Sequence, residues 1–117
     1  MTAASFAQAL DQITRVPGVR GAMLVAGDDG LVVAEHLMEG IRGPAVAALA
    51  ASLATRLRRA MQAAGTGAGH FWQLLCERGG LLVVPGASGI LVVAITAPDV
   101  NAGLVRLELL RAAEAVG

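Results

Sequence analysis

The sequence predicts an α/β domain of the α+β kind, in which one five-stranded antiparallel sheet lies between helices. Three segments repeat apolar residues at steps of three and four, which is the spacing of one helical face. Five short apolar runs are separated by short turns within residues 20–37 and 70–97, and such connections force antiparallel pairing. Residues 81–84 and 90–95 are apolar at every position, so both faces of the sheet must be covered. The predicted order is α-β-β-α-β-β-β-α.

Length and composition limit the class of protein. A chain of 117 residues is long enough for one core, and we expect residues 1–117 to form a single domain. A hydrophobic content of 56% and a mean hydropathy of +0.66 are high for a soluble monomer. These values indicate either that little surface is exposed or that another subunit covers part of it.

The location and the partner classes follow from what the sequence lacks. No apolar run approaches the roughly 18 residues of a membrane helix, and no signal peptide is visible, so we expect no membrane insertion. A single cysteine, Cys76, excludes an internal disulfide and fits a reducing cytoplasm. Nine arginines balance nine acids, so no electrostatic footprint for nucleic acid is present. The absence of lysine removes every site that depends on a lysine amine.

The first helix and the following hairpin are predicted from caps and turn residues. Thr2 or Ser5 can cap a helix that carries Phe6, Leu10 and Ile13 on one face. Pro17-Gly18 ends this helix. Two strands follow, and the turn between them is a hairpin signal. The strands are residues 20–26 and 31–37, joined by Gly27-Asp28-Asp29-Gly30.

A long helix is predicted for residues 44–64. Pro44 suits its first turn, and Gly65 suits the position just past its end. Its apolar residues share one face, which we expect to contact the core. They are Val46, Leu49, Ala50, Leu53, Leu57, Ala60, Met61 and Ala64.

The other faces of this helix carry small and polar residues. The stripe opposite the apolar face consists of Ala48, Ser52, Thr55, Arg59 and Gln62. A flank beside it consists of Ala47, Ala51, Ala54 and Arg58. Small side chains allow a second helix to approach closely, which favours a helical partner. The alternative is that alanine, the best helix former, simply covers the surface.

The third predicted strand, residues 70–77, differs from the others. Its sequence HFWQLLCE mixes aromatic, apolar and polar residues and includes the only tryptophan. A long crossover leads to it, which favours a position at the sheet edge, where unpaired backbone groups invite another strand. The alternative is a protected edge with Trp72 folded onto the core.

The C-terminal part is predicted to contain two strands and a helix. A turn at Arg78-Gly79-Gly80 precedes a strand over 81–84, and a fifth strand covers 90–97. The last helix covers residues 102–116, with Asp99 or Asn101 available as its cap. The leucines of this helix lie around several faces, so the sequence does not indicate which face is buried.

Taken together, these segments resemble the Roadblock/dynein light chain family. The most telling pieces are Gly18-Val19 through Asp29-Gly30, the strand Gly89 to Ile95, and Asn101 to Arg106. The resemblance covers about residues 5–115 and is greatest to bacterial members that regulate a small GTPase in gliding motility. It implies a Roadblock/profilin-like fold and a protein without an active site.

The resemblance also implies a homodimer that binds a Ras-like small GTPase. In the family, the third strands of two subunits pair antiparallel and the second helices lie side by side. The expected dimer interface comprises His70, Phe71, Trp72, Gln73, Leu74, Leu75, Cys76, Ala47, Ala51, Ala54 and Arg58. The GTPase would bind over the second helix, and its expected contacts are Ala48, Ser52, Thr55, Arg56, Arg59 and Gln62.

Residues that could suggest other chemistry lack the partners it requires. Residues 65–69 are rich in glycine but follow a helix, whereas a dinucleotide loop follows a strand. Asp28-Asp29-Gly30 lacks the further carboxylates of a calcium loop. His36, His70 and Cys76 show no metal-ligand spacing and no nucleophile–base arrangement. We therefore expect no enzyme, no cofactor and no metal.

Two further interpretations stay open at this point. The arginines of the long helix could supply a transition-state arginine to a GTPase, although solvated or carboxylate-paired side chains are the simpler interpretation. The alternative function is a dimeric scaffold subunit that tethers larger complexes and has no nucleotide-linked role. A comparison of partner binding with GTP and with GDP separates the two functions, because a scaffold shows no preference.

Overall fold

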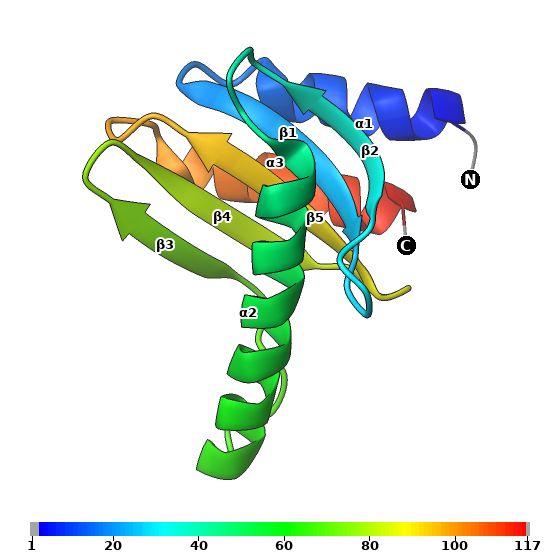
Figure 1. Ribbon diagram of the computed structural model, residues 1–117, viewed down its shortest axis with the longest axis vertical. Coiled ribbons are helices and arrows are strands. Elements are labelled where there is room, and N and C mark those ends of the chain that lie inside the picture. The colour runs from blue at the N-terminus through cyan, green and yellow to red at the C-terminus, as the bar shows by residue number, and fades with distance from the viewer. Residues whose placement is uncertain (1–2, 117) are drawn as a thin grey trace.

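The computed structural model describes residues 3–116 and shows the predicted order of elements (Figure 1). The elements are α1 (Ala3–Thr14), β1 (Val19–Ala26), β2 (Val32–Leu37), α2 (Gly43–Ala64), β3 (Trp72–Cys76), β4 (Gly79–Pro85), β5 (Ile90–Thr96) and α3 (Ala102–Val116).

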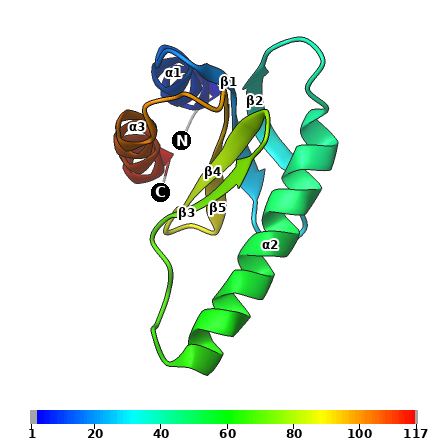
Figure 2. The same cartoon turned by 90° about the vertical axis from the view of Figure 1, so that its left-hand side faces the viewer.

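All five strands form one antiparallel sheet in the order β2-β1-β5-β4-β3. The third strand therefore lies at an edge, which confirms the sequence-based prediction. Helices α1 and α3 cover one face of the sheet and α2 covers the other (Figure 2). This two-sided cover explains why β4 and β5 are apolar at successive positions.

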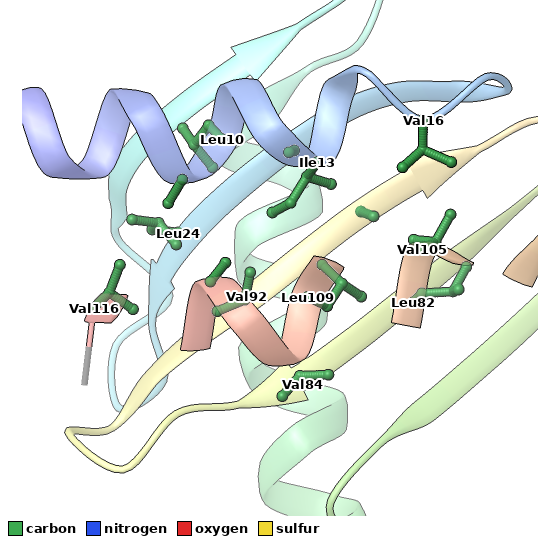
Figure 3. Packing of buried hydrophobic residues seen from close by; sticks show 14 residues of the cluster. Leu10, Ile13, Val16, Leu24, Leu82, Val84, Val92, Val105, Leu109 and Val116 are labelled. Carbon is green, nitrogen blue, oxygen red and sulfur yellow. The ribbon is translucent and has the colours of Figure 1, made fainter. Parts of the chain in front are cut away.

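The larger core lies between the sheet and the α1/α3 layer (Figure 3). Leu10 and Ile13 of α1 are buried here, as their spacing predicts. The open question about α3 is resolved, because one stripe of that helix enters this core while Leu104 and Leu107 stay exposed. The buried stripe consists of Val105, Leu109, Ala112 and Val116.

The smaller core lies beneath α2 and corrects the predicted orientation of that helix. Val46 and Ala50 pack in this core as predicted, but Ala47 is also fully buried, whereas Leu49 is 51% exposed and Leu57 is 38% exposed. The sheet face below is already filled by large side chains, among them Met23 and Val83. Only small residues let α2 approach such a surface closely, so alanines face the sheet and the leucines are displaced to one side.

The turns and caps agree with the sequence in most places. The Leu31 N–H donates to Asp29 Oδ1 at 3.1 Å within the predicted hairpin turn. Gly65 has φ 74°, and its N–H donates to the Gln62 carbonyl at 3.1 Å as α2 ends. Asn101 caps α3, since its Oδ1 accepts a hydrogen bond from the Leu104 N–H at 3.1 Å.

Two details of the prediction are different in the structure. Ser5 lies inside α1 rather than before it, and Thr2 lies outside the described residues. Strand β3 is shorter than residues 70–77, because β4 begins at Gly79, paired with Cys76, and Glu77 belongs to the turn. The predicted turn at Arg78-Gly79-Gly80 is therefore displaced toward the N-terminus.

Candidate interaction surface

The outer edge of β3 opens onto a groove beside α2. Trp72 and Leu74 are paired with Val83 and Leu81 of β4, whose side chains face α2, so they and Cys76 project to that side of the sheet. Leu74 is 43% exposed, and no strand among residues 3–116 covers this edge. A groove of about 480 Å³ runs between β3 and α2, and Val46 and Leu49 form its helical wall.

The leucines displaced from the core line this side of α2. Leu49, Leu53 and Leu57 follow one another at steps of four, and none of the three is buried. We call these three residues the leucine flank. It faces the β3 side of the molecule, since Leu49 lines the groove with Leu74, and Leu57 lines a second hollow with Trp72.

That second hollow, of about 250 Å³, lies between the C-terminal half of α2 and the start of β3. Met61, Phe71 and Pro85 contribute to its apolar walls, and Arg58 stands at its rim. The Trp72 Nε1 donor is buried and has no hydrogen-bond partner among the described residues. Buried hydrogen-bond donors in folded proteins almost always have a partner, because a donor without one lowers the stability of the fold.

The two edges of the sheet differ in how well they are protected. Strand β2 has a bulge, because Val32 is paired with Val25 and Ala34 with Leu24, which leaves Val33 without a partner residue. Strand β3 pairs with β4 in unbroken register along its whole length. A bulge hinders the addition of a further strand, so β3 is the edge that is free to accept one.

The opposite side of α2 carries the predicted GTPase contacts. Ala48, Ser52, Arg56, Arg59 and Gln62 are exposed, and Thr55 is half-buried. Ala48 stands beside Gly30 at the tip of the β1–β2 hairpin, so this stripe faces away from β3. We call these six residues the polar stripe. Whether they bind a partner stays a prediction.

The structure places the predicted dimer residues in two groups. His70, Gln73, Leu74, Leu75, Cys76 and Arg58 are exposed, and Phe71 and Trp72 are half-buried. Phe71 packs toward the α1/α3 layer, where the Arg106 guanidinium lies 5.2 Å from its ring centroid.

The three alanines assigned to the dimer interface behave differently. Ala47 is 0% exposed and Ala51 is 6% exposed, and Ala54 packs against the same core. The prediction that Ala47 and Ala51 contact a second subunit is wrong, because their own sheet already covers them. The leucine flank was not predicted as a surface feature, because its leucines were expected to occupy the core position that the alanines hold. The four-residue spacing of its leucines is a signal, but on the sequence alone it predicts the core face.

Other kinds of site lack their residues in the part of the chain that the structure describes. No group of three or more His, Cys, Asp or Glu side chains among residues 3–116 is placed to hold a metal ion. His36 lies 4.0 Å from Asp11, on the side of the sheet opposite α2. No helix in the same range is long and apolar enough to span a membrane.

Comparison with known proteins adds to this geometry. Residues 6–96 match the Roadblock/LC7 domain family. An uncharacterised protein of Methanocaldococcus jannaschii is 34% identical over 105 residues, which are 90% of each chain. The gliding protein MglB of Thermus thermophilus has a solved structure with a TM-score of 0.85 and 24% identity, covering 99% of this chain and 90% of that one. A solved MglB with a tetrameric arrangement has a TM-score of 0.84 and 26% identity at the same coverage.

Proposed function

The chain belongs to the Roadblock/LC7 family, and from this premise we propose that it is a non-enzymatic cytoplasmic homodimer that binds and regulates a Ras-like small GTPase. The family match and the MglB neighbours support a regulatory or binding role. The proposal adds two points to that role, namely that the protein is a homodimer and that its partner is a Ras-like small GTPase. The observation that carries it is the unprotected β3 edge beside the exposed leucine flank.

The dimer follows from the symmetry that two such edges allow. A two-fold axis perpendicular to the sheet pairs β3 with the partner's β3 in antiparallel fashion and keeps α2 of both subunits on one face. All five residues of β3 then overlap when Leu74 lies on the axis, with Trp72 opposite Cys76 of the partner subunit. The partner's α2 would cover the groove and the leucine flank, which removes apolar surface from water.

The GTPase site follows from what such a dimer leaves exposed. The polar stripe faces the hairpin side of α2, so pairing through β3 does not cover it. Ser52, Thr55 and Gln62 offer hydrogen-bonding groups, and Arg56 and Arg59 offer cations. Arginine is among the residues that are enriched in protein interfaces.

The test is a calorimetric titration with the purified Ras-like GTPases of the same genome, each loaded with GDP or with a non-hydrolysable GTP analogue. We expect one of them to bind with a nucleotide preference. The Arg59→Glu variant should weaken that binding about tenfold or more while the protein stays dimeric, because it reverses a charge inside the site.

The matched control is Arg15→Glu, which reverses an exposed charge just after α1, on the other side of the sheet. Its affinity should stay within about twofold of the wild type. Equal affinity of the Arg59 variant and the wild type would remove Arg59 from the site. If no GTPase binds in either nucleotide state, the proposed function is wrong.

A dimeric scaffold that tethers larger complexes is the second candidate. It is favoured by the exposed Leu104 and Leu107 on α3, which would remain free in the dimer described above. A scaffold binds its partners equally with GTP and GDP, so the same titration separates the two functions.

A further inference from the structure

The nine arginines and nine acids are divided into blocks along the chain. Residues 21–41 contain four acids and no arginine, and residues 42–76 contain four arginines and no acid. The acidic block lies on the β1–β2 hairpin and the following loop. Three arginines of the basic block lie in the C-terminal half of α2, and Arg42 lies just before that helix. Although the net charge is zero, the acidic and the basic residues are therefore concentrated in different parts of the chain.

The basic block is concentrated on the half of α2 that extends past the sheet (Figures 1 and 2). We call residues 54–64 the α2 arm. Its Arg56, Arg58 and Arg59 are exposed, and none of them takes part in an ion pair with another described residue. No acid lies three or four positions away, where a helix usually places one to neutralise such charges. Leu57 and Met61 of the arm line the hollow beside Trp72, so they face the proposed dimer rather than a further copy.

The acidic block lies on the edge of the sheet far from β3. Asp28, Asp29, Glu35 and Glu39 are all exposed there. Three large apolar side chains are exposed in the same segment, namely Leu31, Val33 and Met38. We call these seven residues the β2 rim. Pairing through β3 at the opposite edge leaves the rim uncovered.

We propose that the α2 arm of one copy binds the β2 rim of another and joins dimers into larger assemblies. The two surfaces carry opposite charges, and the rim adds three exposed apolar side chains. The net charge of zero means that two copies do not repel each other at a distance. The contact is heterologous, so each dimer has two arms and two rims with which to join others.

A second copy fits the arm better than an extended polyanion. Outside residues 42–76 the chain has five arginines and nine acids, and this excess of negative charge repels a nucleic-acid backbone or an anionic membrane. The rim supplies four carboxylates on one small surface, which matches the size of the arm.

The arm shares Arg56 and Arg59 with the polar stripe, so assembly and partner binding would compete.

The test is the mass of the full chain by light scattering and sedimentation, over a range of concentrations at about 25 mM and about 300 mM salt. We expect species larger than a dimer at low salt that dissociate at high salt. Neutralising the arm with Arg56→Gln, Arg58→Gln and Arg59→Gln should weaken the assembly about tenfold or more. Neutralising the rim with Asp28→Asn, Glu35→Gln and Glu39→Gln should have the same effect.

A control variant of equal net charge is Gln8→Glu, Arg15→Gln and Arg111→Gln, all on the α1/α3 side of the molecule. It should assemble as the wild type does. In a decisive mixture, an arm with three Arg→Glu changes and a rim with three acid→Arg changes each fail to assemble alone and assemble together. A mixture that stays unassembled, or a wild type that is a simple dimer at low salt, overturns the proposal.

One further variant distinguishes this inference from the proposed function, on whose dimer it rests. Leu74→Asp disrupts the β3 edge and leaves the arm and the rim unchanged. If dimerisation through β3 is wrong, that variant changes nothing while the arm variants still lose the salt-dependent species.

Discussion

At the scale of single residues, Gly30 fixes how closely the hairpin lies on α2. It has φ +74°, and a Cβ at this position would lie 3.1 Å from the Ala48 Cα. The turn sequence alone predicts the hairpin but not this approach, because the helix residue that it meets is far along the chain. Both the positive φ angle and the lack of space for a side chain therefore favour glycine at this position.

Gly40 separates these two constraints, because it has φ +91° and a Cβ added there would meet nothing within 4 Å. Gly40→Ala should cost about 1 kcal/mol for the left-handed conformation alone. Gly30→Ala should cost about 2–3 kcal/mol, since the neighbouring backbone of α2 must also move. Urea denaturation of both variants measures the difference, and equal losses would show that the close approach has no energetic effect.

At the scale of elements, amphipathic helices with one apolar stripe were predictable and α2 was not. Leu10 and Ile13 of α1 are the only large apolar residues of their segment besides Phe6, so their face is unambiguous. Helix α2 offers a leucine face and an alanine face. The choice between them depends on the size of Met23, Val83 and Val93 across the interface, which the helix sequence does not contain.

The packing of α2 predicts which alanines tolerate enlargement. Ala50→Leu should destabilise the fold by about 1–3 kcal/mol, because Ala50 is fully buried against the sheet. Ala63→Leu on the exposed side of the same helix should change stability by less than about 0.5 kcal/mol. Thermal and urea unfolding compare the two, and an Ala50 variant as stable as the Ala63 variant would contradict the observed orientation.

At the scale of the whole molecule, the composition predicted either little exposed surface or a surface covered by another subunit, and nine large apolar side chains are exposed among the described residues. Four of these side chains, Leu49, Leu57, Leu74 and Leu75, lie on α2 and β3, and the other five lie in and beside β2 and on α3. The edge position of β3 was predictable from the long crossover before it. Which residues contact a partner was not, because that depends on the rotation of α2 about its axis.

The proposed dimer predicts a specific sensitivity to charge at the β3 edge. Leu74→Asp should give a monomer by light scattering, because it would place two carboxylates on the two-fold axis of an apolar interface. Leu107→Asp is the control, since Leu107 on α3 is equally exposed at 43% and lies on the other face of the sheet. A soluble Leu74 variant with the mass of a dimer would refute pairing through β3.

Trp72 has a practical consequence for all of these measurements. It is the sole indole of the chain, and it lines the hollow next to the free strand edge. Its emission therefore senses the solvent at one place only. In the proposed dimer, this tryptophan is an optical reporter of subunit dissociation, usable at dilutions where scattering gives no signal.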